Sequence, residues 1–345
     1  MKRARGVAVC LLAAGLPALA QTQPDVGSGF QVFPPDNPWN WDIRGHAVHP
    51  SSTAFVNSMG SSTTLFADQS FQITVVGALQ PNVAVTFGAY SDESDPGPGF
   101  GSPPAGAATG SYPIPPGAPI EDGGDAHVLV VDTEAKLLYE TYQTSGGPPW
   151  SATCGAVFDL ASNALRPDGW TSADAAGLPI FPGLLRYEEV AAGVIPHALR
   201  VTASSTQDTY LYPARHQAGS ANANLPPMGM RLRLKAGYDI SAYTGAARVV
   251  LEALKKHGLI VADNGSSWYI SSTVDSRWAS STIRDIMDVP GSAFEAVRTV
   301  DDGGNPIPPA GGGGGGGGGH GGCGALGAEV LLALGILAGL RLRYS

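Results

Sequence analysis

Short runs of β-branched and aromatic residues recur along the whole chain, separated by glycine, proline and asparagine. With 47 glycines and 28 prolines in 345 residues, short elements joined by turns are expected. The runs have the length and composition of strands. Strands are predicted within residues 70–76, 82–90, 128–131, 137–142, 155–160, 197–203, 209–214, 230–236, 259–263 and 268–272.

Three helices are expected between these strands. The clearest spans residues 246–257, where apolar side chains recur on one face and Gly258 ends the helix. Shorter helices are expected within residues 172–179 and 184–193. Many short strands with few helices predict a mainly β fold, an antiparallel sandwich or jelly-roll-like domain, with an α+β domain as the alternative.

The first twenty residues have the pattern of a secretory signal peptide. A basic start precedes a short apolar run and Ala18-x-Ala20, the small-residue motif of a cleavage site. Cleavage after Ala20 is therefore expected. Lipid attachment at Cys10 is a weaker alternative, because almost no apolar region precedes that residue.

The C-terminus combines polyglycine, Cys323, a short apolar run and a basic end. The apolar run is shorter than the roughly 20 residues that span a bilayer comfortably. This order resembles the bacterial MYXO-CTERM and GlyGly-CTERM sorting signals, which rhomboid-like proteases process. The resemblance implies a sorting protease as partner, Cys323 as the processing or lipid-attachment residue, and membrane contact through the tail only. A plain C-terminal anchor is the alternative.

These features divide the chain into six segments. They are a signal peptide (1–20), a Pro-rich segment with the first strands (21–90), a Gly/Pro-rich acidic loop without regular elements (91–124), the main β-rich domain (125–300), a Gly-rich linker (301–322) and the Cys-containing sorting tail (323–345).

Charge and cysteine content restrict the partners and the means of stabilisation. The formal net charge is −9 at pH 7, which disfavours nucleic acid as a partner. Cys154 is the one cysteine outside the terminal segments, so no disulfide is expected in the domain. Its neighbours indicate a small apolar residue at the start of a strand. Trp39 and Trp41, set between prolines, are expected to dock the N-terminal segment onto the domain, and a sugar-binding face is the alternative.

Common enzyme signatures are absent from the sequence: there is no G-x-S-x-G elbow, no H-E-x-x-H and no P-loop. Polar residues at strand ends are the remaining candidates. Asp125 precedes His127 by two positions, so both lie on one strand face, where the carboxylate can orient the imidazole. The candidate catalytic residues are Asp125, His127, His197 and His216.

Substrate-binding candidates come from neighbouring positions. Alternation places Arg200 on the opposite strand face from His197, and it separates Arg215 from His216. Asp263-Asn264-Gly265 either forms a hairpin turn, the preferred interpretation, or presents polar groups beside Trp268. The substrate-binding candidates are Arg200, Arg215, Asp263, Asn264 and Trp268.

Neither a cofactor nor a metal is expected. Three histidines on three strands could converge on a metal, but their spacing does not require it, and separate framework histidines are preferred. Calcium is the ion that acidic oxygens could bind; here too a solvated acidic loop is preferred, since the spacing does not fit an EF-hand. The acids concerned are Asp92, Glu93, Asp95, Asp122 and Asp125.

Six segments resemble a family of exported bacterial proteins for which no activity is established, and the resemblance covers nearly the whole mature chain. It therefore implies export and assigns no catalytic residue. The segments are FPPDNPWN, DGGDAHVLVVD, ALRPDGWTSADAAGLPI, HALRVT, LPPMGMRLRLKA and GLIVADNGSSWYIS.

Two functional hypotheses follow. The first is an exported, surface-tethered enzyme that acts on polysaccharide as a hydrolase or lyase, because paired carboxylates, histidine, tyrosine and arginine suit that chemistry. The alternative is a non-catalytic surface module that binds glycan or a protein partner. The candidate acids are Asp125, Glu140, Glu188, Glu189 and Asp263.

Overall fold

The computed structural model describes residues 26–98, 106–278 and 286–310. Three α-helices lie in this part of the chain: α1 (Ser52–Ser58), α2 (Tyr187–Ala192) and α3 (Gly245–Lys256). Four 3-10 turns accompany them, at Pro38–Asn40, Ser91–Glu93, Phe181–Gly183 and Gly291–Ala293. The strands are β1 (Phe66–Phe71), β2 (Ile73–Val76), β3 (Val83–Phe87), β4 (Thr109–Tyr112), β5 (Val128–Asp132), β6 (Leu137–Tyr142), β7 (Trp150–Ala152), β8 (Cys154–Asp159), β9 (Leu199–Ala203), β10 (Arg231–Leu234), β11 (Leu259–Asn264), β12 (Tyr269–Thr273) and β13 (Phe294–Val297).

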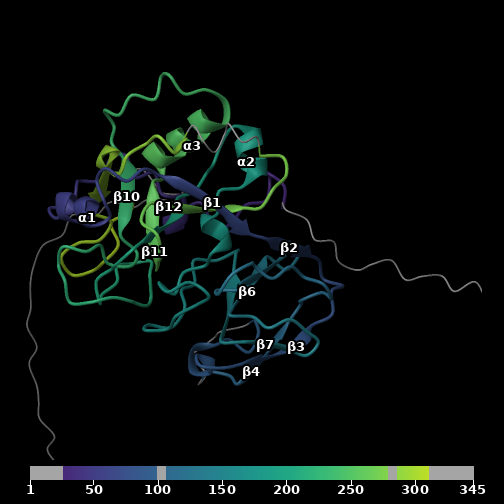
Figure 1. Cartoon of the computed structure of the whole chain (residues 1–345). Coiled ribbons are helices and arrows are strands. Elements are labelled where there is room, and N and C mark those ends of the chain that lie inside the picture. Colours follow the sequence, from purple (N-terminus) through teal and green to yellow (C-terminus); the bar gives the residue numbers. More distant parts are fainter. Residues whose placement is uncertain (1–25, 99–105, 279–285, 311–345) are drawn as a thin grey trace, which may run out of the picture. The chain divides into compact units, whose positions relative to one another are not determined.

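The strands form three sheets, which confirms a mainly β fold with few helices (Figure 1). The six-stranded sheet has the order β1-β12-β9-β11-β10-β13, the four-stranded sheet β2-β5-β6-β8, and the three-stranded sheet β4-β3-β7. Pairing within each sheet is mixed. For example, β5 and β6 form the expected antiparallel hairpin, whereas β9 and β11 are parallel.

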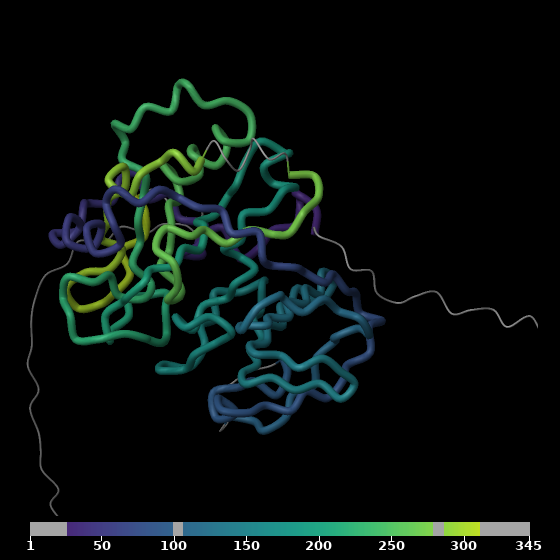
Figure 2. The backbone as a smooth tube through the Cα atoms, viewed as in Figure 1, coloured from purple at the N-terminus to yellow at the C-terminus, as the bar shows by residue number. Residues whose placement is uncertain are grey.

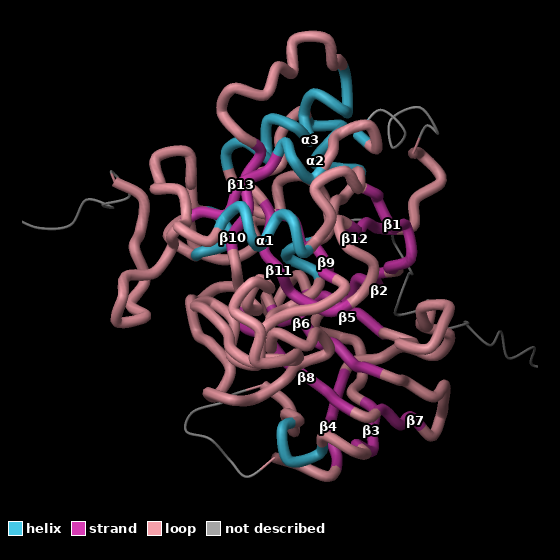
Figure 3. Tube along the Cα trace, turned by 60° about the vertical axis from the view of Figure 1, so that its left-hand side comes forward, coloured by secondary structure: helices cyan, strands magenta, loops and turns pink. Residues whose placement is uncertain are grey.

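The four-stranded sheet is covered on both faces. Along β5, Leu129 and Val131 join the large core that includes the six-stranded sheet, while Val128 and Val130 join a second core with the three-stranded sheet. Figure 3 shows β5 and β6 between the strands of the other two sheets, and Figure 1 shows β6 in the same place. Burial on both faces explains why this strand is an uninterrupted apolar run rather than an alternating one.

Helix α3 ends where the sequence predicts. Gly258 has φ +70°, and a Cβ there would approach Leu232 O to 2.1 Å, so only glycine fits the turn from α3 into β11. The helix contacts β10 and α2. Figure 3 shows α2 and α3 side by side at one end of the view, and β3, β4 and β7 at the opposite end.

The N-terminal segment is docked as expected. Trp39 and Trp41 are buried, and the Trp41 indole donates to Asp36 O at 2.8 Å. Further along, the His49 backbone N–H donates to Ala296 O at 2.8 Å, next to β13. In Figure 2 this purple segment accordingly lies against yellow-green chain from the other end of the described region.

Several local predictions are wrong. Residues 172–179 form turns instead of a helix, residues 209–214 form no strand, and β4 lies inside the acidic loop. The Asp263-Asn264-Gly265 turn does not close a hairpin, because β9 lies between β11 and β12. Strands β11 and β12 follow each other in the sequence but are separated in the sheet by β9.

Ala20, Cys323, the signal peptide and the sorting tail lie outside the described residues. Within residues 26–98, 106–278 and 286–310, no helix has the length and apolar character needed to cross a membrane.

Candidate functional site

Three polar side chains lie side by side on one face of the six-stranded sheet. Asp68 of β1 pairs with Ser271 of β12, and Ser271 follows Ile270, which pairs with Val201 of β9. Ser271 therefore lies beside Arg200, whose Nη1 donates to its hydroxyl. This register puts Asp68, Ser271 and Arg200 in one row across three strands.

A β-bulge adds Asp263 to this row. Val261 pairs with Val201, but Asp263 pairs with Thr202, so Ala262 is the extra residue. Without the bulge, Ala262 would lie opposite Thr202, and Asp263 would point to the other face. With it, Asp263 lies on the face of Arg200. We call Asp68, Ser271, Arg200 and Asp263 the polar row.

Arg200 organises the polar row through Asp174, which belongs to the connection before α2. Its Nε and Nη2 donate to the two Asp174 oxygens at 2.8 and 2.7 Å, and Nη2 also donates to Asp263 Oδ2 at 3.0 Å. The guanidinium lies 5.5 Å from the ring centre of Phe71. Burial alone would lower the pKa of Arg200, but Asp174 raises it above its ordinary value, so the cation is retained.

Asp263 is the exposed member of a carboxyl pair. Its side chain is 22% exposed, whereas that of Asp174 is fully buried. Burial, and then the negative charge of Asp174, raise the pKa of Asp263 to about 8. At neutral pH this carboxyl therefore holds a proton and can donate it.

His127, the residue before β5, lies near the polar row: its ring centre is 5.5 Å from that of Phe71, over which the Arg200 guanidinium lies. Its Nδ1 is paired with Glu121, and its Nε2 lies 3.0 Å from Ala173 O. Burial would lower the pKa of His127, but the bond and charge of Glu121 raise it. The ring is closed off by these partners, since the side chain is 3% exposed. His127 therefore has a structural role, and it holds Glu121 and the Ala173 carbonyl in place.

Glu140 of β6 is the second carboxyl with a strongly shifted pKa. It is fully buried and accepts hydrogen bonds from the backbone N–H groups of Ile180 and Phe181, at 3.0 and 2.9 Å. Burial raises the pKa of Glu140 to about 7, with the Asp174 charge as a further cause. Glu140 fixes the chain after Asp174, out of reach of solvent.

Tyr142, the last residue of β6, lies at the partly exposed side of the site. Burial raises its pKa, and the charges of Asp125 and Asp263 raise it further, so its hydroxyl lies within the field of both carboxyl groups. Tyr142 is partly exposed and Asp125 is exposed. The solvent-accessible side of the site is therefore formed by Asp125, Tyr142 and Asp263.

The other predicted histidines have separate partners. His197 binds Glu189 Oε2 at 3.0 Å and Ala198 O at 2.7 Å, on the helix side of the sheet. His216 Nδ1 lies 2.8 Å from Ala175 O. Within the described chain, the hydrogen bonds and ion pairs join none of His127, His197 and His216 to another.

The remaining binding candidates lie at different depths. Arg215 pairs with Asp168 at 3.0 Å, and Asn264 donates to Thr206 Oγ1 at 3.1 Å. Trp268, expected as a possible platform for ligands, is completely buried, and its indole donates to Gly60 O at 2.9 Å. Trp268, the residue before β12, is therefore part of the core and has no contact with solvent.

The sequence does not indicate two members of the polar row, Asp68 and Ser271. It also does not indicate Asp174 and Glu121, the partners of Arg200 and His127. Asp174 falls in a segment predicted to be helical, and Glu121 in a loop taken as solvated. Asp68 and Ser271 come together only through strand pairing that joins distant segments. Spacing in the sequence carries no signal for such contacts.

Two of the acidic residues considered for calcium have other partners. Asp95 pairs with Arg166, and Glu93 accepts from the Thr171 backbone N–H at 2.6 Å. In the part of the chain that is described, no group of three or more His, Cys, Asp and Glu side chains is arranged to hold a metal ion.

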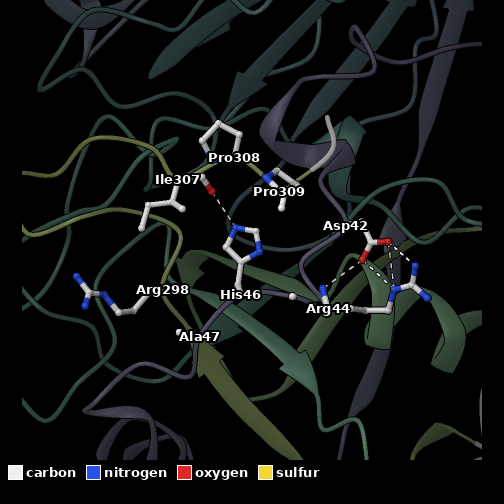
Figure 4. A pocket seen from close by; sticks show the side chains of 10 residues that line it. Asp42, Arg44, His46, Ala47, Arg298, Ile307, Pro308 and Pro309 are labelled. Atoms are coloured by element: carbon white, nitrogen blue, oxygen red, sulfur yellow. Dashed lines mark hydrogen bonds and ion pairs between the residues drawn. The ribbon is translucent and has the colours of Figure 1, made fainter. Parts of the chain in front are cut away.

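A further cavity lies elsewhere, lined by Asp42, residues 44–47, Arg298 and residues 307–310 (Figure 4). Its volume is about 830 Å³. His46 Nε2 lies 2.8 Å from Ile307 O, and Arg44 bonds Asp42. Asp42 is the one carboxyl group among its lining residues and is paired with Arg44, so this cavity offers no acid–base pair comparable to Asp174 and Asp263.

Comparison of the chain with protein-family models, with curated proteins and with solved structures finds no match. Function is therefore inferred from the residues of the site itself.

Proposed function

We propose that this protein hydrolyses a polysaccharide, with Asp263 as the proton donor. The observation that carries the proposal is a carboxyl group that is partly exposed and has its pKa raised to about 8. A general acid must hold its proton at the working pH, and burial beside a second carboxylate is an established way to achieve this.

Asp174 and Arg200 act as positioning residues. The two bonds from Arg200 hold the Asp174 carboxylate beside Asp263, so the proton stays on the more exposed carboxyl. Ser271 and Phe71 hold the guanidinium from the other sides. The acid is thus oriented before substrate arrives, which is the arrangement that makes proton transfer efficient.

Asp125 is the second carboxyl of the proposed reaction. Asp263 would protonate the glycosidic oxygen as its bond to the anomeric carbon breaks. Asp125 would take a proton from the water that adds to that carbon. Tyr142, which lies in the field of both groups, would orient this water or a sugar hydroxyl.

Hydrolysis is favoured over elimination by a lyase. A lyase needs a cation to neutralise the uronate carboxylate. Arg200, the cation of this cluster, already binds Asp174, Asp263 and Ser271. It therefore has little capacity left for a substrate carboxylate.

The alternative, a glycan-binding module without catalysis, has less support. Such modules commonly present aromatic faces to solvent. Four tryptophans, Trp39, Trp41, Trp150 and Trp268, are buried. A partly exposed carboxyl with a strongly raised pKa is also more typical of a catalytic site than of a binding face.

Export and tethering complete the proposal. We infer them from the signal peptide that ends at Ala20 and from the tail with Cys323. An extracellular polysaccharide is the substrate class that such a location makes accessible.

The test is release of reducing ends from a panel of neutral and acidic polysaccharides. We expect release by the wild-type protein and a loss of roughly 10²- to 10⁴-fold in rate for Asp263→Asn, the range for removal of a general acid. Asp208→Asn is the matched control, because Asp208 is exposed and its carboxylate has no bond among the described residues. An Asp263→Asn variant as active as the Asp208→Asn control would overturn the assignment. If the folded wild-type protein binds a polysaccharide but releases no ends, the binding module is the correct reading.

A further inference from the structure

The cavity shown in Figure 4 has a positively charged side chain on each side. Its volume of about 830 Å³ is within the range of roughly 300–1,000 Å³ that is usual for small-molecule sites. Arg44 and Arg298 are the arginines of its lining, and Asp42 is its one carboxylate. In the view of Figure 4 the two guanidinium groups point away from each other, on opposite sides of His46. A ligand that contacts both arginines therefore needs anionic groups on separate parts of its body.

Both arginines keep N–H groups that no described residue uses. Arg44 donates to Asp42 through Nε at 2.9 Å and through Nη2 at 2.5 Å, so Nη1 is unbonded. Arg298 donates to Asp302 through Nη2 at 2.5 Å, so Nε and Nη1 are unbonded. The two arginine side chains are 65% and 34% exposed. Ion pairs this exposed contribute little, so a ligand carboxylate can bind beside each aspartate or take its place.

His46 offers a hydrogen-bond acceptor between the two arginines. Its Nε2 lies 2.8 Å from Ile307 O, so Nε2 carries the hydrogen and donates to that carbonyl. In the neutral ring Nδ1 is then an acceptor, and no described residue donates to it. Figure 4 shows Nδ1 on the side of Asp42 and Arg44, and it is not one of the unpartnered atoms that are closed off from solvent. The ring stacks on Trp41, with centres 6.3 Å apart, which fixes its orientation before a ligand binds.

The wall formed by residues 307–309 favours a sugar over a peptide. An extended peptide is recognised through main-chain hydrogen bonds. Pro308 and Pro309 have no N–H, and the N–H and carbonyl of Ile307 are already bonded to Thr299 O and His46. This wall therefore offers no main-chain donor to a peptide. It does offer apolar surface, against which the C–H face of a sugar ring can pack.

We propose that this cavity binds an acidic oligosaccharide. Carboxylates on two different sugar units are held by Arg44 and Arg298, and a hydroxyl between them donates to His46 Nδ1. The site goes beyond the proposed hydrolysis and does not depend on it, because the cavity shares no residue with the polar row. It would hold an anionic glycan apart from the reacting groups.

Calorimetric titration of the purified full chain with trigalacturonate tests the proposal. We expect trigalacturonate to bind. Galacturonate and the full methyl ester of the trimer should bind at least roughly tenfold more weakly, because the first has one carboxylate and the second has none. Equal binding of galacturonate would contradict the use of two anionic groups. Trigalacturonate that does not bind, or a triglutamate peptide that binds equally well, would overturn the proposal.

Three arginine variants locate the site. Arg44→Met and Arg298→Met should each weaken trigalacturonate binding by roughly tenfold. Arg248→Met is the matched control, because Arg248 also pairs with an exposed carboxylate four residues on, Glu252, and does not line the cavity. An equal loss in this control would mean that charge alone attracts the ligand, which would overturn the site. Asp263→Asn should bind trigalacturonate like the wild-type protein, so failure of this site and failure of the hydrolytic proposal are distinguishable.

Two aspartate variants should bind more tightly, which loss of folding cannot imitate. Asp42→Asn and Asp302→Asn each remove a carboxylate that competes for an arginine, so trigalacturonate binding should strengthen roughly two- to fivefold. Asp208→Asn changes the net charge equally, but its carboxylate has no bond among the described residues, so this control should bind like the wild-type protein. Binding that is unchanged in Asp42→Asn and Asp302→Asn, or strengthened equally in Asp208→Asn, would contradict placement of the ligand carboxylates at Arg44 and Arg298.

Discussion

Arg200 donates two parallel hydrogen bonds, of 2.8 and 2.7 Å, to the two carboxylate oxygens of Asp174. Asp174 is completely buried, and Arg200 is 4% exposed. A buried pair of this geometry compensates both charges only while both partners are present. The position of Asp263, which bonds the same guanidinium, depends on it.

Replacing Arg200 with methionine should strongly destabilise the fold. The substitution leaves the Asp174 carboxylate buried without a cation, which costs about 3–5 kcal/mol in the free energy of unfolding. Urea denaturation measures this change. Arg248→Met is the control, because the Arg248–Glu252 pair is exposed and should contribute less than about 1 kcal/mol. A second change, Asp174→Asn, should recover part of the loss; equal stabilities of Arg200→Met and Arg248→Met would contradict this account.

Glu140 should make stability depend on pH. Its folded pKa of about 7 is above the ordinary value of 4.5, so the folded chain holds this proton more tightly than the unfolded chain. The stabilisation is complete below about pH 4.5 and is lost as the pH rises to about 7. In Glu140→Gln this contribution is absent, so the free energy of unfolding should fall less steeply over that range. Parallel curves for the two proteins would show that Glu140 titrates normally.

Cys154 should react with thiol reagents only after unfolding. The residue is completely buried, and burial raises the pKa of its thiol to about 11, so thiolate is scarce at pH 8. Mass spectrometry of the peptide that contains Cys154 can follow its labelling with and without urea. Rapid labelling of the folded protein would mean that this thiol is accessible.

If the protein is exported and tethered as proposed, Cys323 should decide how it is retained. If the tail is a processed sorting signal, Cys323→Ala should accumulate unprocessed chain and change the ratio of cell-associated to released protein. Immunoblots of the two fractions provide the measurement. A plain anchor would leave processing and location unchanged, and recovery of the domain in the cytoplasm would refute export.

The sequence predicts the parts of this fold that depend on local pattern. The β5–β6 hairpin, α3 with its stop at Gly258, the docked tryptophans and the buried Cys154 all follow from composition over a few residues. Strand neighbours do not. The insertion of β9 between β11 and β12 depends on contacts across the chain, which outweigh the local preference of Asn-Gly for a hairpin.

The sequence predicts the candidate site only in part. It indicates His127, Arg200 and Asp263 as polar residues at strand ends. It does not indicate Asp174, because the environment of that residue comes from Arg200, in a strand that follows much later. The bulge at Ala262, which turns Asp263 toward Arg200, has no signature in an apolar run.

The central claim, that Asp263 holds a proton at neutral pH, can be measured directly. In protein labelled with ¹³C at aspartate carboxyl groups, Asp263→Asn identifies the Asp263 signal, and its chemical shift is followed against pH. We predict a midpoint near pH 8, because burial and Asp174 disfavour the charged form. A midpoint near the ordinary pKa of 3.8 would contradict the claim and remove the proton donor from the proposed reaction.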